Sequence, residues 1–164
     1  MEGPNSITIR KDLKMATFAS DTDLLSYEPD IQNFGIREFD SDHEKTFDDI
    51  IRLLNIKWWR KADYGSYDIA IAGGTNERLT NSKLTASQFT RAAVYHVLAY
   101  YIYPKLTKME EAPDSFERKM IYYKQKFEEE FDLILRVGVE YDADSSGTIS
   151  ESERQAFHFN RLVR

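Results

Sequence analysis

Apolar residues recur every three or four positions in three long segments of the chain, a spacing that predicts amphipathic helices. In the first segment the apolar stripe consists of Phe47, Ile50, Ile51, Leu54 and Trp58. Residues 41–44 read Ser-Asp-His-Glu, a capping box whose serine and glutamate side chains each bond to a free backbone N–H. We therefore predict a helix over about 43–60. Trp59 lies beside its stripe, either as a second packing surface or as a partner contact.

The other two segments predict the centre of the fold. Residues 86–103 are apolar on almost every side and follow a second capping box at 85–88, so we expect a buried helix that Pro104 ends. The third helix begins after Asp114 and spans about 23 residues, or roughly 35 Å, before Gly138. Its stripe consists of Phe116, Met120, Tyr123, Phe127, Phe131 and Ile134.

The remaining segments are shorter or lack periodicity. Residues 20–33 predict a short helix that Pro29 interrupts and Gly35 closes. Residues 1–20 form a polar N-terminal arm, and 63–84 form a long glycine-containing loop. The predicted fold class is all-α: a small helical bundle over 21–138, with three long helices and one short helix, followed by a C-terminal loop and tail over 139–164.

Composition narrows the class of protein. Acidic residues number 28 and basic residues 22, so the formal net charge is −6. This balance argues against a main task of binding phosphate backbones. The chain has no cysteine, which excludes disulfides, cysteine-ligated metals and a cysteine nucleophile. The N-terminus lacks a signal-peptide pattern, and the most apolar run (92–103) is too short to cross a bilayer. We expect a soluble protein without a membrane partner.

The sequence contains no recognisable catalytic motif. The three histidines are far apart, and none has zinc-ligand spacing. Phosphate-binding glycine loops and the nucleophile-elbow pattern do not occur. Carboxylate pairs such as Asp48 and Asp49 fall on the polar side of a predicted helix. We therefore do not expect an enzyme.

Residues 142–153 match the calcium-binding loop of an EF-hand at every ligand position. The side-chain donors would be Asp142, Asp144 and Ser146, with the Thr148 carbonyl, Ser150 directly or through water, and Glu153 through both oxygens. Gly147 permits the sharp turn, and Ile149 is the apolar residue at loop position eight. This pattern predicts calcium as the one candidate cofactor, and a metal-free turn is the alternative.

The neighbours of this loop differ from those of an EF-hand. Gly138 and the residues around Val139 favour an extended approach to Asp142, where an EF-hand has a helix. No second loop is present to form a pair. We therefore expect an isolated calcium-type loop that stiffens the joint between the third helix and the tail.

The C-terminal tail combines apolar and basic residues. Its apolar side chains are Phe157, Phe159, Leu162 and Val163. Apolar side chains at a free terminus are more stable against a partner than in water. We interpret the tail as a docking segment, with a solvated frayed end as the alternative.

The order of these elements resembles the head-to-tail adaptor proteins (connector or head-completion proteins) of tailed bacteriophages. The resemblance covers about residues 20–150 and rests on TDLLSYEPDI, FDDIIRLLNIKWW, LTASQFTRAAVYHVLAYYIYPKL, DSFERKMIYYKQKFEEEFDLIL and GVEYDADSSGTIS. It implies a structural protein in the neck of the virion, made in the host cytoplasm. The implied assembly is a homo-oligomeric ring, twelve-fold by resemblance, between the portal protein and a tail or neck protein. DNA would pass through its channel without sequence-specific binding. The alternative function is a calcium-binding regulatory protein with a single EF-hand.

Overall fold

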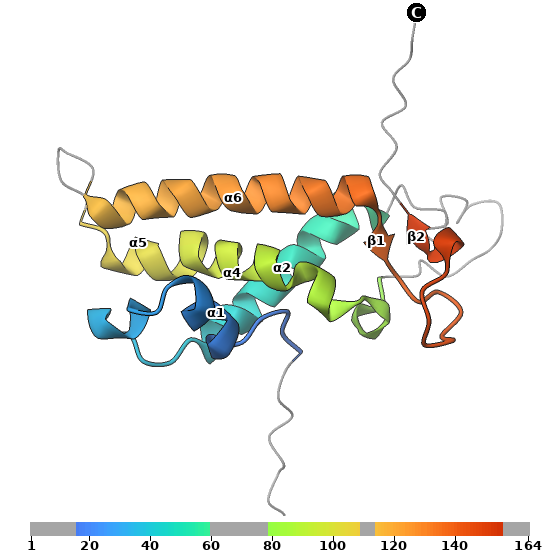
Figure 1. Ribbon diagram of the computed structural model, residues 1–164, viewed down its shortest axis with the longest axis horizontal. Coiled ribbons are helices and arrows are strands. Elements are labelled where there is room, and N and C mark those ends of the chain that lie inside the picture. The colour runs from blue at the N-terminus through green and yellow to red at the C-terminus, as the bar shows by residue number, and fades with distance from the viewer. Residues whose placement is uncertain (1–15, 60–78, 109–113, 156–164) are drawn as a thin grey trace, which may run out of the picture.

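The computed structural model describes residues 16–59, 79–108 and 114–155, and these form an all-α fold (Figure 1). The predicted small helical bundle is confirmed. The elements are α1 (Asp21–Tyr27), α2 (Asp40–Lys57), α4 (Ala86–Val97), α5 (Tyr103–Leu106) and α6 (Ser115–Val137), with strands β1 (Val139–Glu140) and β2 (Arg154–Gln155). Short 3₁₀ turns cover Ile31–Phe34, Asn81–Lys83 and Glu151–Glu153.

The centre of the bundle is α4, as its nearly all-round apolar sequence predicts. It packs against α6, α2 and α1, and Figure 1 shows α4 and α5 running along α6. Phe89, Val94 and Val97 on α4 are fully buried. Burial of such a side chain contributes about 1.5–3 kcal/mol, so the buried side chains of α4 contribute substantially to the stability of the fold.

The predicted bounds of α6 are confirmed. The helix begins after Asp114, whose carboxylate accepts the Glu117 N–H at 2.6 Å. It ends at Gly138, which adopts φ = +115°. Four residues of the predicted stripe are buried, and so is the neighbouring Leu135. The four are Tyr123, Phe127, Phe131 and Ile134.

The first turn of α2 differs from the prediction. The helix begins at Asp40, three residues earlier than expected, and the Ser41–Glu44 capping box does not form. Side-chain contacts of Asp42 and His43 with other parts of the fold hold the first turn instead. Asp42 is 3% exposed and accepts a bond from Lys105 Nζ at 2.6 Å, and the His43 ring lies 3.0 Å from Asp21. The ion pair of buried Asp42 and the hydrogen bond of buried His43 therefore fix this end of α2.

A π-helical turn replaces the predicted stop at Pro104. Residues Leu98–Ile102 form this turn, in which the Tyr103 N–H bonds to the Leu98 carbonyl, and α5 then continues to Leu106. Proline is tolerated in the first turn of a helix because its missing N–H is not needed there. Within the described parts of the chain, no helix is both long and apolar enough to cross a membrane.

The end of the predicted N-terminal arm belongs to the core. Phe18 is 5% exposed, and its ring centroid lies 4.6 Å from that of Phe47 and 4.9 Å from that of Phe89. Its carbonyl accepts a bond from Thr90 Oγ1 at 2.9 Å. The chain before it, residues 1–15, lies outside the described residues. Next along the chain, α1 begins with a capping box between Ser20 and Asp23.

Candidate metal-binding loop

Two short strands enclose the candidate loop. After Gly138 ends α6, β1 leads into Asp142, and a single 3₁₀ turn (Glu151–Glu153) leads out into β2. The strands pair antiparallel, with Val139 opposite Gln155 and Glu140 opposite Arg154. The extended approach predicted from the sequence is confirmed. Among the described residues the loop therefore has a strand on each side, where an EF-hand has helices.

Gly138 brings the two strands together. A Cβ at this position would lie 2.8 Å from Arg154 Cγ and 3.0 Å from the Arg154 carbonyl oxygen. The positive φ of this residue is also a conformation that other residues adopt only with strain. Glycine is therefore required for both the turn out of α6 and the close approach of β2.

A residue at the start of α4 and a residue of the 3₁₀ turn before it anchor the loop to the bundle. The Gln88 side chain donates to the Gly138 carbonyl at 2.8 Å and accepts the Glu140 N–H at 3.0 Å. Lys83 accepts the Asp142 N–H at its carbonyl at 2.9 Å, and its Nζ donates to the Ala143 carbonyl at 2.7 Å. The loop is therefore fixed to a rigid element of the core.

Gln88 and Lys83 are residues that the sequence did not indicate. Gln88 was expected to close a capping box with Thr85, but the Thr85 side chain makes no capping bond. The side-chain amide of Gln88 instead forms hydrogen bonds with the backbone around β1. Both contacts join residues about 50 to 60 positions apart, and such separation leaves no local signal in a single sequence.

The first half of the loop folds around the Asp142 carboxylate. One carboxylate oxygen accepts the Ser146 N–H and the other accepts the Gly147 N–H, each at 2.9 Å. Gly147 has φ = +80°, and Ser145 has φ = +60°. Asp144 accepts the Ser146 N–H at 2.9 Å. Hydrogen bonds from Ser146 hold the pKa of Asp144 below its usual range, so this carboxylate is ionised at neutral pH.

Glu153 closes the loop from its second half and is 6% exposed. One oxygen accepts the Ala143 N–H at 2.8 Å and the Asp144 N–H at 3.3 Å. The other accepts the Ser150 N–H at 3.0 Å and the Ser150 hydroxyl at 2.8 Å. The hydrogen bonds from Ser150 are the main reason why the pKa of Glu153 is lowered. This group is therefore also charged at neutral pH.

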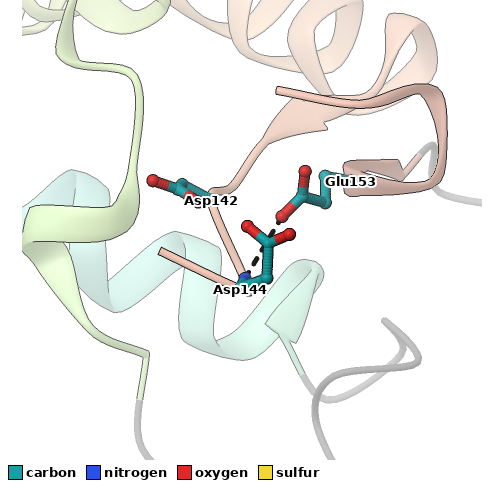
Figure 2. Close-up of side chains that lie close together, drawn as sticks. All are labelled: Asp142, Asp144 and Glu153. Carbon is teal, nitrogen blue, oxygen red and sulfur yellow. Dashed lines mark hydrogen bonds between the residues drawn. The ribbon is translucent and has the colours of Figure 1, made fainter. Parts of the chain in front are cut away.

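The loop brings together the three carboxylates among the six predicted ligands. Ligand atoms of Asp142, Asp144 and Glu153 lie within 4.8 Å of one another, and Figure 2 shows the Asp144 and Glu153 carboxylates facing each other. Of the other predicted donors, the Ser146 hydroxyl donates to the Thr148 carbonyl at 3.1 Å, and Ser150 bonds to Glu153. Like charges at this separation repel one another, and a cation with oxygen ligands would relieve that repulsion.

The donor set fits a hard cation. All of the predicted ligand atoms are oxygens, as calcium requires. In the described conformation both Glu153 oxygens accept backbone or side-chain hydrogen bonds. Bidentate ligation would therefore compete with hydrogen bonds on both oxygens, with those from the Ala143 and Asp144 amides on one and with those from Ser150 on the other.

The position of Trp59 agrees with a packing surface and not with the partner contact that was its alternative interpretation. Its side chain is 6% exposed, and its ring centroid lies 5.1 Å from that of Tyr141 and 5.7 Å from that of Trp58. The residue therefore belongs to a packing surface between the end of α2 and the chain that enters the loop. The other predicted partner-binding residues, Phe157, Phe159, Leu162 and Val163, lie outside the described residues, and so do residues 63–78 of the predicted long loop.

Comparison with known proteins finds no matching family, no similar curated protein and no matching solved structure. The functional interpretation therefore rests on the residues and their arrangement.

Proposed function

We propose that the chain is a structural assembly protein, a head-to-tail adaptor that forms a ring between the portal and the tail or neck proteins of a tailed virion. The order of its elements carries this proposal: short α1, long α2, buried α4, long α6 and the closing acidic loop. This is the order on which the resemblance to adaptor proteins rests. A small bundle whose helices share one core suits a subunit that is used in many copies.

The charge of the chain supports a channel that DNA passes through. A net charge of −6 repels phosphate groups and disfavours tight binding to the DNA backbone. A ring that continues the portal channel has to let the genome slide, so weak interaction with DNA suits this function.

Mixing the chain with a portal protein tests the proposal. Size-exclusion chromatography with light scattering should show a ring of the chain, or its co-elution with the portal protein. A chain that stays monomeric and ignores both portal and neck proteins would contradict the adaptor function.

We further propose that the loop over residues 142–153 binds calcium. The support is the match of the loop to the calcium-binding pattern, together with the three carboxylates within 4.8 Å. Strands, and not long helices, lie on either side of the loop, which favours a stiffening role over a sensor that opens a groove. Bound calcium would supply charge neutralisation and a rigid link between α6 and β2.

Calorimetric titration of calcium into the wild-type chain and into the Asp142→Ala variant tests this site. The wild type should bind and gain about 2.7 kcal/mol of stability at a hundredfold excess of calcium over Kd, whereas Asp142→Ala should not. Asp132→Ala, which removes an exposed carboxylate from α6, should bind like the wild type. Absence of both heat and thermal stabilisation in the wild type would contradict the metal site.

A further inference from the structure

Asp49 on α2 faces two side chains of the helical segment that crosses it. Figure 1 shows α2 running obliquely across α4, against which it packs. The Tyr101 hydroxyl donates to Asp49 Oδ2 at 2.5 Å, and His96 Nε2 lies 3.8 Å from the same oxygen. The first distance is that of a hydrogen bond, and the second is too long for one. Asp49 therefore has one bonded partner and a second partner close by.

The π-turn over Leu98–Ile102 places both side chains on this side of the helix. In a regular α-helix, residues five positions apart point about 140° away from each other around the axis. A π-turn bonds each residue to the fifth along the chain and so holds more residues per turn. Here His96 and Tyr101 both face the Asp49 carboxylate. π-turns inside helices occur frequently at functional sites, and this one gives Asp49 its two neighbours.

His96 is fixed in the core, whereas Asp49 has room to turn. His96 is 4% exposed, and its ring stacks on Tyr100 at 4.5 Å and contacts Phe127 edge-on at 4.7 Å between centroids. Its Nδ1 lies 3.2 Å from Thr46 Oγ1. The Asp49 side chain is 39% exposed. A rotation that brings its carboxylate oxygen about 0.9 Å closer to His96 Nε2 would form a hydrogen bond.

Among the described residues, the charge of Asp49 is the one that acts on His96. Burial lowers the pKa of His96 to about 4, and the attraction of Asp49 opposes this effect. The neighbour from α6, Phe127, carries no charge. The other charged groups of the cluster act on the two tyrosines of the π-turn, and they are Asp42, Lys45, Asp48 and Glu128. A proton on His96 would therefore place a new charge beside a single carboxylate.

We propose that Asp49 changes partner when His96 takes up a proton, and that Tyr101 is the positioning residue that opposes this change. With a neutral ring, the carboxylate stays with the Tyr101 hydroxyl, which remains protonated because burial and then Asp49 raise its pKa. An imidazolium has a donor at both ring nitrogens, and its charge attracts the carboxylate more strongly than a neutral phenol does. The carboxylate then turns to His96 Nε2. The result is an acid-sensitive switch in the contact between α2 and α4, independent of the proposed adaptor and calcium functions.

An NMR titration of His96 in the wild type and in Tyr101→Phe tests the positioning role. Phenylalanine keeps the ring and removes the hydroxyl that holds Asp49. The midpoint for His96 should rise by at least about 1 pH unit in this variant, because the carboxylate is free to pair with the imidazolium. Tyr100→Phe, which removes the neighbouring hydroxyl of the same π-turn, is the matched control and should change the midpoint by less than about 0.3 pH unit.

A double variant separates the partner change from a loosened core. Asparagine at position 49 cannot form the ion pair, so Tyr101→Phe/Asp49→Asn should show no rise above the wild-type midpoint. A core that merely admits water would raise the midpoint in both the single and the double variant, because weaker burial of His96 lowers its pKa less. No rise in Tyr101→Phe, or an equal rise in both variants, would overturn the proposal.

The wild type gives a second readout that needs no substitution. The Tyr101 hydroxyl loses its carboxylate acceptor when Asp49 turns away, and the carbon chemical shift of Tyr101 Cζ reports that loss. This shift should change with the same pH midpoint as the His96 ring, while dispersed amide signals show that the chain stays folded. A Tyr101 signal that stays constant through the His96 midpoint would overturn the partner change.

Discussion

Replacement of His96 by asparagine should remove a large part of the acid sensitivity of the fold. His96 lies on α4 and is 4% exposed, with Nδ1 3.2 Å from Thr46 Oγ1 and the ring stacked on Tyr100 at 4.5 Å between centroids. Burial lowers the pKa of His96 from 6.5 to about 4, because it outweighs the opposing attraction of Asp49. The imidazole is therefore neutral in the folded protein at pH 7.

The magnitude follows from the difference in pKa between the two states. A shift from 6.5 to about 4, at about 1.4 kcal/mol per pH unit, corresponds to about 3 kcal/mol. Since the folded pKa is lowered, the unfolded chain takes up the proton first as the pH falls. The stabilisation is complete above pH 6.5 and is lost progressively as the pH falls to about 4.

Urea unfolding of the wild type and His96→Asn at pH 7 and pH 4 measures this contribution. Asparagine keeps a polar group near Thr46 but does not titrate. Between pH 7 and pH 4, the free energy of unfolding should fall by about 3 kcal/mol more in the wild type than in the variant. The other titrating groups contribute equally to both proteins, so the difference reports His96. Equal losses in the two proteins, or an NMR titration midpoint for His96 near 6.5, would refute the reasoning.

Other substitutions test the packing around the loop and the core by urea unfolding. Gly138→Ala should lower the free energy of unfolding by about 2 kcal/mol or more, because the added Cβ would lie 2.8 Å from Arg154 Cγ and the residue has a positive φ. Gly35→Ala is the control: its φ is +91° but nothing lies within 4 Å of the added Cβ, so the loss should be only about 1 kcal/mol. Gln88→Ala removes two hydrogen bonds to the backbone around β1, so it should cost about 2 kcal/mol and speed hydrogen exchange at the Glu140 amide; unchanged exchange would contradict the anchor. Phe18→Ala should cost about 3 kcal/mol, since the ring packs on Phe47 and Phe89; a loss below 1 kcal/mol would place Phe18 outside the core.

Periodic segments of the sequence predicted the helices well. The bounds of α6 follow from Asp114 and Gly138, because a side-chain cap and a positive-φ glycine are local signals. The burial of α4 follows equally from its composition. The fold class and the main core could therefore be predicted from the sequence.

Features that depend on distant contacts were not predictable. In place of the predicted Ser41–Glu44 capping box, the first turn of α2 has an ion pair between Asp42 and Lys105 and a hydrogen bond between His43 and Asp21. Pro104 was tolerated because a π-turn precedes it. In the loop, the motif identified the three carboxylates that converge, but the pairing of β1 with β2 depends on Gly138 and Arg154, which lie 16 positions apart in the sequence.

Electron cryomicroscopy of the chain mixed with its portal protein tests the central proposal most directly. The account predicts a closed ring of the chain, coaxial with the portal, whose lumen continues the portal channel. A portal ring without bound chain, or chains bound away from the channel axis, would contradict it.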